Sequence, residues 1–324
     1  MRAYVTGATG FIGGRVARAL LDGGWEVTVL ARSPDRARDL AEAGARVRIG
    51  DITDPESLHA SIPGHDAVFH LAAWYAIGVR DAQRIERVNV GGTMNVLDAA
   101  VSSGIPKIVY CSTIAALGTV PGGGISDEND LHPGGSYGSL YEETKLRAHR
   151  IASERASAGA PIVIVMPGAT YGPGDESMVG VLLKLYAKGL LIACPFQETG
   201  LSWVHVDDVA GGIVAAHDKG ETGEGYVLGG DNETIGGVFK RLQPLVHRRP
   251  PARLPNWVVK AGVPFGPLVA RILKQEPDLL KEGLTSLNGS WMYSSKKAEA
   301  AIGYHYRSIE EGIPPVIEQL RAKS

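Results

Sequence analysis

Short apolar runs alternate with amphipathic stretches along the first half of the chain. Alternating or continuous apolar residues predict strands at Arg2–Thr6, Glu26–Leu30, Arg46–Ile49, Ala67–Leu71, Lys107–Cys111 and Pro161–Met166. Helical spacing or composition predicts helices between them at Phe11–Asp22, Pro34–Ala43, Asp54–Ala60, Val88–Ser103 and Tyr141–Ala158. Repeated strand–helix units of this length indicate a doubly wound α/β fold, in which helices cover both faces of a parallel sheet.

The pattern changes after Pro167, where proline, glycine and tryptophan become frequent and the predicted strands are short. We expect strands at Leu201–Val206 and Tyr226–Leu228 to return to the sheet or its edge. Further helices are predicted at Thr234–His247, Trp257–Leu273 and Leu279–Leu287. The chain therefore divides into a first domain over 1–170, with 201–230 returning to it, and a smaller, discontinuous C-terminal lobe over 171–200 and 231–324.

A glycine-rich turn, Gly7-Ala8-Thr9-Gly10-Phe11-Ile12-Gly13, joins the first strand to the first helix. In such a unit the first glycine permits a tight turn, the second leaves room for a pyrophosphate, and the third lets the helix pack on the strand. The free N–H groups and the positive end of the helix dipole then face the phosphates. The turn predicts a Rossmann dinucleotide site, with a purely structural turn as the alternative. Its contacting residues would be Gly7, Thr9, Gly10, Phe11, Ile12 and Gly13.

The end of the second strand bears on the choice of nicotinamide cofactor. A site for NAD usually has Asp or Glu there, bonded to the ribose hydroxyls. Here the strand ends in Arg32 and Ser33, and Arg36 and Arg38 follow on the next helix. The planar guanidinium of Arg32 suits a 2′-phosphate, and the Ser33 hydroxyl adds a donor. NADP(H) is therefore favoured; NAD(H) is the alternative if Arg32 is an ordinary solvated residue.

Tyr141 and Lys145 lie four residues apart, on one face of a predicted helix. An ammonium close to a phenol favours the phenolate and moves its pKa down from about 10 toward neutrality. Tyr141 would then exchange a proton with a substrate oxygen while hydride moves to or from a nicotinamide. The same spacing recurs at Tyr293 and Lys297, which we assign to an ordinary solvated helix start.

Ser112 and Thr113 directly follow the strand Lys107–Cys111, at the sheet edge where a pocket is expected. The Thr113 hydroxyl is placed to hydrogen-bond and orient the reacting oxygen. Taken alone, a threonine at this position is usually a turn or cap residue.

Composition and charge limit the classes of binding partner that we expect. The 324 residues carry a formal net charge of -2, which gives no basic footprint for nucleic acid or an anionic membrane. No run approaches the roughly 18 apolar residues of a membrane span, and no signal peptide is visible, so a cytoplasmic location is expected. Cys111 and Cys194 are too far apart and too few to predict a disulfide or a metal site.

Eight motifs in order resemble the extended short-chain dehydrogenase/reductase family, over nearly the whole chain. They are TGATGFIGG from Thr6, GDITD from Gly50, HLAA from His70, VNVGGTMNVL from Val88, YCST from Tyr110, YEETK from Tyr141, PGATYGPGD from Pro167 and WVHVDDVA from Trp203. The resemblance implies that Thr113, Tyr141 and Lys145 form a catalytic triad, with Lys145 also bonding the nicotinamide ribose. It further implies a homodimer paired through helices near 88–103 and 141–158. The cofactor contacts that it implies are Asp51 and Ile52 at the adenine, and Leu71, Ala72, Ala73 and Pro167 along the site.

Within this family the chain is most similar to dihydroflavonol-reductase-like, hydroxysteroid-dehydrogenase-like and hopanoid-associated sugar epimerase-like members. Ile114 and Ala115 stand where sugar-nucleotide dehydratases carry an Asp-Glu pair, and Leu201 and Ser202 stand where epimerases usually carry a phosphate-gripping arginine. The expected substrate pocket is apolar or aromatic, which suits a bulky neutral carbonyl compound, although core packing is the alternative for each residue. Its candidate residues are Trp74, Tyr75, Ile114, Tyr171, Met178, Tyr186, Phe196 and Trp203.

The sequence thus predicts an NADP(H)-dependent oxidoreductase that reduces a ketone or aldehyde of a bulky apolar substrate. A nucleotide-sugar epimerase that keeps NAD tightly bound is the first alternative. A non-catalytic NADP-sensing protein is the second, and a complete Thr113, Tyr141 and Lys145 set argues against it because a sensor needs no proton donor.

Overall fold

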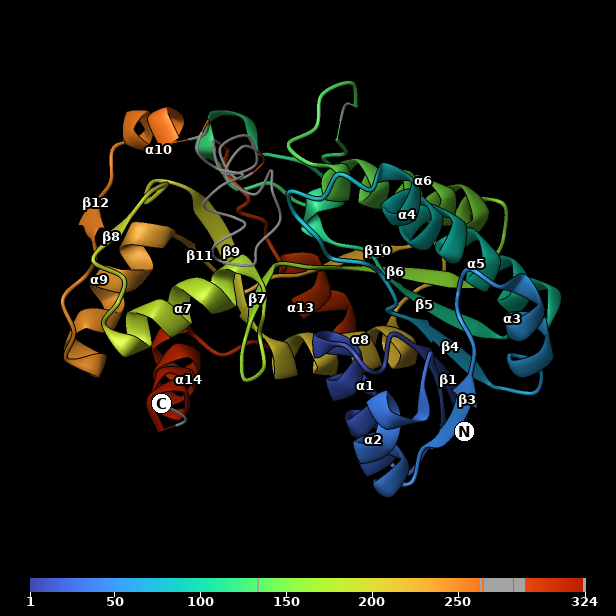
Figure 1. Cartoon of the computed structure of the whole chain (residues 1–324). Helices are drawn as coiled ribbons and strands as arrows, with labels where there is room; N and C mark the ends of the chain where they lie inside the picture. The colour runs from blue at the N-terminus through green and yellow to red at the C-terminus, as the bar shows by residue number, and fades with distance from the viewer. Residues whose placement is uncertain (133, 263, 265–281, 283–288, 323–324) are drawn as a thin grey trace.

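A seven-stranded parallel sheet forms the larger part of the molecule (Figure 1). The computed structural model describes residues 1–132, 134–262, 264, 282 and 289–322. The strand order is β10-β6-β5-β4-β1-β2-β3, and all six pairings are parallel. The strands are β1 (Arg2–Thr6), β2 (Glu26–Ala31), β3 (Arg46–Ile49), β4 (Ala67–His70), β5 (Lys107–Cys111), β6 (Ile162–Pro167) and β10 (Gly225–Leu228). The predicted doubly wound Rossmann architecture is confirmed.

Both faces of the central strands are buried, which explains why those strands are mostly apolar at consecutive positions. Val68 and Ile108 belong to one hydrophobic cluster, whereas their neighbours Phe69 and Val109 belong to the cluster on the opposite face. Side chains alternate across a strand, so a strand covered on both faces is apolar at most of its positions. The edge strand β3 is mostly exposed and accordingly carries two arginines.

Helices cover the two faces as separate layers (Figure 1). One layer contains α1 (Phe11–Asp22), α2 (Arg38–Glu42), α8 (Val206–Lys219) and α13 (Lys296–Ile302), and the other contains α3 (Pro55–Ser61), α4 (Ala82–Glu86), α5 (Gly92–Ser102) and α6 (Leu140–Ser157). Short 3-10 turns occur at Pro34–Ala37, Ile114–Ala116 and Pro121–Gly123. The helix predicted from Val88 begins earlier, because α4 runs into α5 through a π-helical turn at Arg87–Gly91.

The smaller lobe is built around a second, three-stranded sheet of order β11-β9-β7. Its strands are β7 (Ala169–Tyr171), β9 (Gly200–His205) and β11 (Asp231–Thr234). The expectation that both later strands return to the main sheet is therefore half correct: β10 joins its edge, whereas β9 pairs with β7 and β11 instead. The other elements of the lobe are α7 (Met178–Lys188), β8 (Ala193–Cys194), α9 (Ile235–Val246), β12 (Ala252–Arg253), α10 (Asn256–Gly262) and α14 (Ile309–Ala322).

Two predicted helices extend beyond the described residues. Helix α10 agrees with the prediction over Trp257–Leu273 as far as Gly262, and nearly all of the remainder lies outside the described part of the chain. The prediction over Leu279–Leu287 falls almost wholly outside it. Helix α13, which we had grouped with the smaller lobe, packs against α8 and β10 of the larger domain.

Candidate active site

The glycine turn lies at the point where the strand order of the sheet reverses. Strand β1 pairs with β2 on one side and β4 on the other, so a crevice opens at the carboxyl ends of β1 and β4. Gly7 has a φ of +75°, and a Cβ on it would lie 2.5 Å from the amide nitrogen of Ala72, after β4. A Cβ on Gly13 would overlap the Gly7 carbonyl. Both glycines are therefore required by close backbone packing.

The N-terminus of α1 suits an anionic ligand. Gly10 is its N-cap residue; no side chain of the described residues caps the helix, and its first turn contains no acid. The first-turn amides, including those of Phe11 and Ile12, thus point free N–H groups toward the crevice. A helix end with free donors and a positive dipole binds phosphate. The glycine turn and the first turn of α1, together called the glycine cradle, consequently fit the diphosphate of a dinucleotide.

The ends of β2 and β3 border the glycine cradle. Arg32 and Ser33 directly follow β2; Arg32 is exposed, and no carboxylate pairs with it in the described part of the chain. Asp51 follows β3, and its carboxylate accepts hydrogen bonds at 2.9 Å from both the amide and the hydroxyl of Thr53. Ile52 is buried against Gly92 of α5. The remaining predicted contacts lie at the same sheet edge: Leu71, Ala72 and Ala73 follow β4, and Pro167 ends β6.

The first turn of α6 holds Tyr141 next to the end of β5. The Ser139 hydroxyl caps this helix by accepting the Glu142 amide. Lys145 is almost fully buried; its Nζ donates to the Cys111 carbonyl at 3.0 Å and lies 5.2 Å from the centroid of the Tyr110 ring. The Thr113 hydroxyl accepts the Ala115 amide at 3.2 Å and lies close enough to the Tyr141 hydroxyl to lower its pKa. The structure thus brings Thr113, Tyr141 and Lys145 together.

The electrostatics of Tyr141 differ from the prediction. Burial raises the pKa of Tyr141 to about 12, while the Lys145 ammonium and the Thr113 hydroxyl lower it by less. The predicted shift toward neutrality is wrong here, because removing the phenolate from water outweighs the attraction of the ammonium. In this environment Tyr141 is protonated at neutral pH and can act as an acid.

The second Tyr–Lys pair is also corrected. Tyr293 is 1% exposed, and its hydroxyl donates to the Gly118 carbonyl at 2.6 Å, so it is a core residue and not part of a solvated helix start. Helix α13 begins only at Lys296. Lys297 pairs with Glu224 at 2.8 Å, away from the nucleotide crevice.

One of the predicted pocket residues, Tyr75, lies beside the Tyr141 ring, and a second, Met178, lies beside Tyr75. Tyr75 packs edge-on against Tyr141 with ring centroids 5.0 Å apart, and the Met178 amide lies next to the Tyr75 hydroxyl. Trp74 lies in the same loop, where the Arg84 guanidinium covers its ring at 4.4 Å. Tyr75 is 48% exposed, so this wall is open to solvent. The helix α7 and the loop after β4 therefore form an aromatic wall next to the catalytic candidates.

The other predicted pocket residues are buried in the core. Ile114, Tyr171, Tyr186 and Trp203 are at most 5% exposed, and the Trp203 Nε1 donates to the Glu233 carbonyl. Phe196 is partly buried and has a φ of 58°. Ile114, Tyr171, Tyr186 and Trp203 therefore pack in the core, which is the alternative to a pocket role.

Two further contacts position the site and were missed by sequence reasoning. Asn89, in the π-helical turn, accepts the Trp74 amide at 2.7 Å and donates to the Trp74 carbonyl and Thr144 hydroxyl, both at 3.2 Å. His132 bonds Glu142 at 3.0 Å, and both side chains are buried. Asn89 ties the aromatic loop to α6, while Glu142 fastens the turn that carries Tyr141. The VNVGG motif contains Asn89, but its spacing alone does not reveal the partners.

Comparison with known proteins agrees with this geometry. The model of the NAD dependent epimerase/dehydratase family matches residues 3–229. A putative dihydroflavonol 4-reductase of Synechocystis sp. is 30% identical, over 97% of this chain and 93% of the relative. Sterol demethylase protein B of Methylococcus capsulatus is 32% identical, over 79% of this chain and 78% of the relative.

A solved structure, that of gox2253, superimposes with a TM-score of 0.82 at 31% identity, covering 99% of this chain and 98% of the other. The homologues are NAD(P)-dependent oxidoreductases, dehydratases and epimerases, which act on CH–OH and C=O groups. The match spans the crevice, the glycine cradle and the Thr113, Tyr141 and Lys145 cluster. The chain therefore belongs to the NAD-dependent epimerase/dehydratase family, the extended short-chain dehydrogenase/reductases, and is an NAD(P)-dependent enzyme.

Proposed function

We propose that the protein is an NADP(H)-dependent reductase of a ketone or aldehyde on a bulky apolar substrate. The observation that carries this proposal is the cluster of Thr113, Tyr141 and Lys145 beside the Tyr75 ring and the start of α7. A proton donor there adjoins an aromatic wall, which is the arrangement that a neutral carbonyl compound requires.

Each residue of the cluster has a distinct task in this reaction. The glycine turn and Arg32 would hold NADPH, which would supply the hydride for the carbonyl carbon. Tyr141 gives its proton to the carbonyl oxygen, which becomes the hydroxyl of the product. Thr113 hydrogen-bonds the same oxygen and orients it, and the Lys145 ammonium stabilises the phenolate that Tyr141 becomes. A protonated Tyr141, which burial favours, suits the reductive direction.

The residues around the cluster support a reductase over a sugar-nucleotide enzyme. Ile114, which follows Thr113, is buried and apolar, so it provides no acid for the elimination of water. Leu201 and Ser202 are buried in β9, and the Ser202 hydroxyl is bonded to the Asn232 side chain and the Tyr293 carbonyl. Neither presents a cation to a sugar diphosphate.

The cofactor preference and substrate class have further support. Arg32 is exposed and free of ion pairs in the described chain, as a 2′-phosphate ligand must be. Among the relatives, one is named a putative dihydroflavonol 4-reductase and another sterol demethylase protein B, and both names refer to polycyclic, largely apolar compounds. We propose that the substrate here is of that class.

A screen of ketones and aldehydes tests this function. NADPH and NADH are each mixed with the protein and the candidate carbonyl compounds, and cofactor oxidation is followed by absorbance. We expect turnover of bulky apolar carbonyls with NADPH. A nucleotide-sugar epimerase, the alternative that the family description includes, would instead purify with NAD bound and would interconvert sugar nucleotides without net oxidation.

We also propose a homodimer paired through α5 and α6. Met94 and Val101 on α5 are 40% and 42% exposed, which provides apolar surface for such contact. Helix α6 offers less apolar surface for this pairing, because Arg147 and Arg150 are exposed on it. Light scattering at micromolar concentration should give twice 34.3 kDa; the monomer mass would exclude the dimer.

A further inference from the structure

One edge of the smaller lobe exposes large apolar side chains. Leu190 and Ile192, in the turn after α7, are 64% and 81% exposed, and Trp257 of α10 is 71% exposed. Strand β12 joins these segments: it pairs with β8, the Ala252 amide donates to the Ile192 carbonyl at 2.8 Å, and α10 follows it directly (Figure 1). Exposed apolar residues that gather on one edge, instead of being scattered singly, mark an interaction surface.

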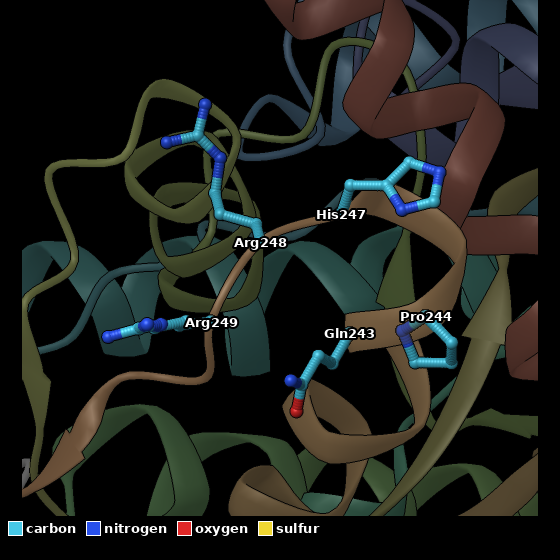
Figure 2. A pocket seen from close by; sticks show the side chains of 5 residues that line it. All are labelled: Gln243, Pro244, His247, Arg248 and Arg249. Atoms are coloured by element: carbon cyan, nitrogen blue, oxygen red, sulfur yellow. The ribbon is translucent and has the colours of Figure 1, made fainter.

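Arginines accompany these side chains. Arg248 and Arg249 line a shallow hollow of about 370 Å³ with Gln243, Pro244 and His247, and their side chains extend from one stretch of chain (Figure 2). The Arg248 guanidinium lies against Gly189, next to Leu190. No carboxylate pairs with Arg248 or Arg249 among the described residues. We call Leu190, Ile192, Arg248, Arg249 and Trp257 the basic–apolar edge.

We propose that the basic–apolar edge docks on the surface of an anionic lipid bilayer. Tryptophan and aliphatic side chains partition into the boundary between headgroups and acyl chains, and arginines beside them bind anionic headgroups. The unpaired arginines favour this occupant over an apolar protein groove, in which their charges would have to be desolvated. Among the described residues, every helix is too short or too polar to cross a bilayer.

This inference revises the conclusion that we drew from the net charge. The formal net charge of -2 is a sum over the whole chain, and it conceals the local positive charge of Arg248 and Arg249 at one edge. The edge is also connected to the site: α7 runs from Met178, beside Tyr75, to Lys188, and its 11 residues span about 16 Å. A bilayer-dissolved substrate would thus lie one helix length from the aromatic wall. This connection rests on the proposed function, whereas the docking itself does not.

Sedimentation with lipid vesicles tests the proposal, without any need for turnover. The protein should bind vesicles of phosphatidylcholine with phosphatidylglycerol, bind pure phosphatidylcholine far less, and dissociate as salt increases. Replacing both arginines, Arg248→Gln with Arg249→Gln, should weaken partitioning about thirtyfold. Replacing Ile192→Ser with Trp257→Ser should weaken it at least about tenfold.

The matched control removes the same charge elsewhere. Arg18 and Arg87 are exposed, form no ion pair in the described chain and lie on the larger domain, so Arg18→Gln with Arg87→Gln should leave vesicle binding unchanged. Thermal midpoints of all variants verify that they fold. Equal binding by the wild type and the Arg248/Arg249 variant would overturn the proposal. The absence of binding to the anionic vesicles would overturn it as well, and a dimer that Ile192→Ser dissociates would then show that a second copy of the chain covers this edge.

Discussion

The buried pair of His132 and Glu142 provides a quantitative test of how the site is held. The Gly134 amide donates to the His132 Nδ1 at 2.8 Å; because an amide N–H can only donate, the ring proton lies on Nε2 and points at Glu142. The other Glu142 oxygen accepts the Gly138 amide at 2.7 Å. Glu142 therefore accepts two hydrogen bonds, one at each carboxylate oxygen.

The substitution Glu142→Gln keeps the shape and removes one acceptor. The amide group of glutamine faces one of the two donors with its own N–H, so one bond to a charged acceptor is lost and a buried donor is left unpaired. A bond to a charged group contributes roughly 1.5–3 kcal/mol and an unpaired donor costs roughly 1–3 kcal/mol. We expect a loss of about 3 kcal/mol in unfolding free energy, which lowers the thermal midpoint by roughly 4 °C in a chain of this size.

Differential scanning calorimetry measures this shift, and the neighbouring Glu143→Gln is the control. Glu143 is partly exposed, and its carboxylate accepts no hydrogen bond among the described residues, so its midpoint should stay within about one degree. Because Glu142 adjoins Tyr141, turnover should also fall in Glu142→Gln. An identical midpoint for Glu142→Gln and the wild type would refute the reasoning.

Two further predictions concern the cofactor and the effect of acid. Arg32→Asp should weaken NADPH binding on the order of 10–100-fold and make NADH the tighter ligand, since the charged contact with the 2′-phosphate is replaced by a ribose-binding acid; calorimetric titration measures both, and equal affinities of the wild type for the two cofactors would contradict the assignment. Burial lowers the pKa of His70 to about 3 and that of His149 to about 4, from 6.5. The unfolded chain therefore takes up these protons first, so the stability that they contribute is complete above about pH 6.5 and declines as the pH falls toward 4. Urea midpoints should fall over this window, and less steeply in His149→Gln; a wild-type midpoint constant from pH 7 to 4 would exclude this origin.

The larger domain could be predicted from the sequence because its signals are local. Continuous apolar runs specify strands that are buried on both faces, and Gly7 and Gly13 are required by contacts within one strand–turn–helix unit. The earlier start of the helix at Ala82 was missed because Ala82–Glu86 is mostly polar and Ile85 is its single fully buried side chain.

The features that sequence reasoning missed depend on tertiary contacts. Tyr293 is buried because its segment lies along Ser126 and reaches Gly118, far away in the sequence. The pKa of Tyr141 is raised because the surrounding protein removes water, and no spacing of Tyr and Lys reports that. The net charge likewise says nothing of where Arg248 and Arg249 lie.

The most direct test of the account is hydride transfer in Tyr141→Phe. The phenol hydroxyl is the proposed proton donor, while the ring remains to pack against Tyr75. With the carbonyl compound that the screen identifies, single-turnover oxidation of bound NADPH should slow by about 10²–10⁴-fold, and the affinity for NADPH should stay close to that of the wild type. Tyr306→Phe is the control, since the Tyr306 hydroxyl has no hydrogen bond among the described residues. Wild-type rates in Tyr141→Phe would contradict the assignment of Tyr141 as the proton donor.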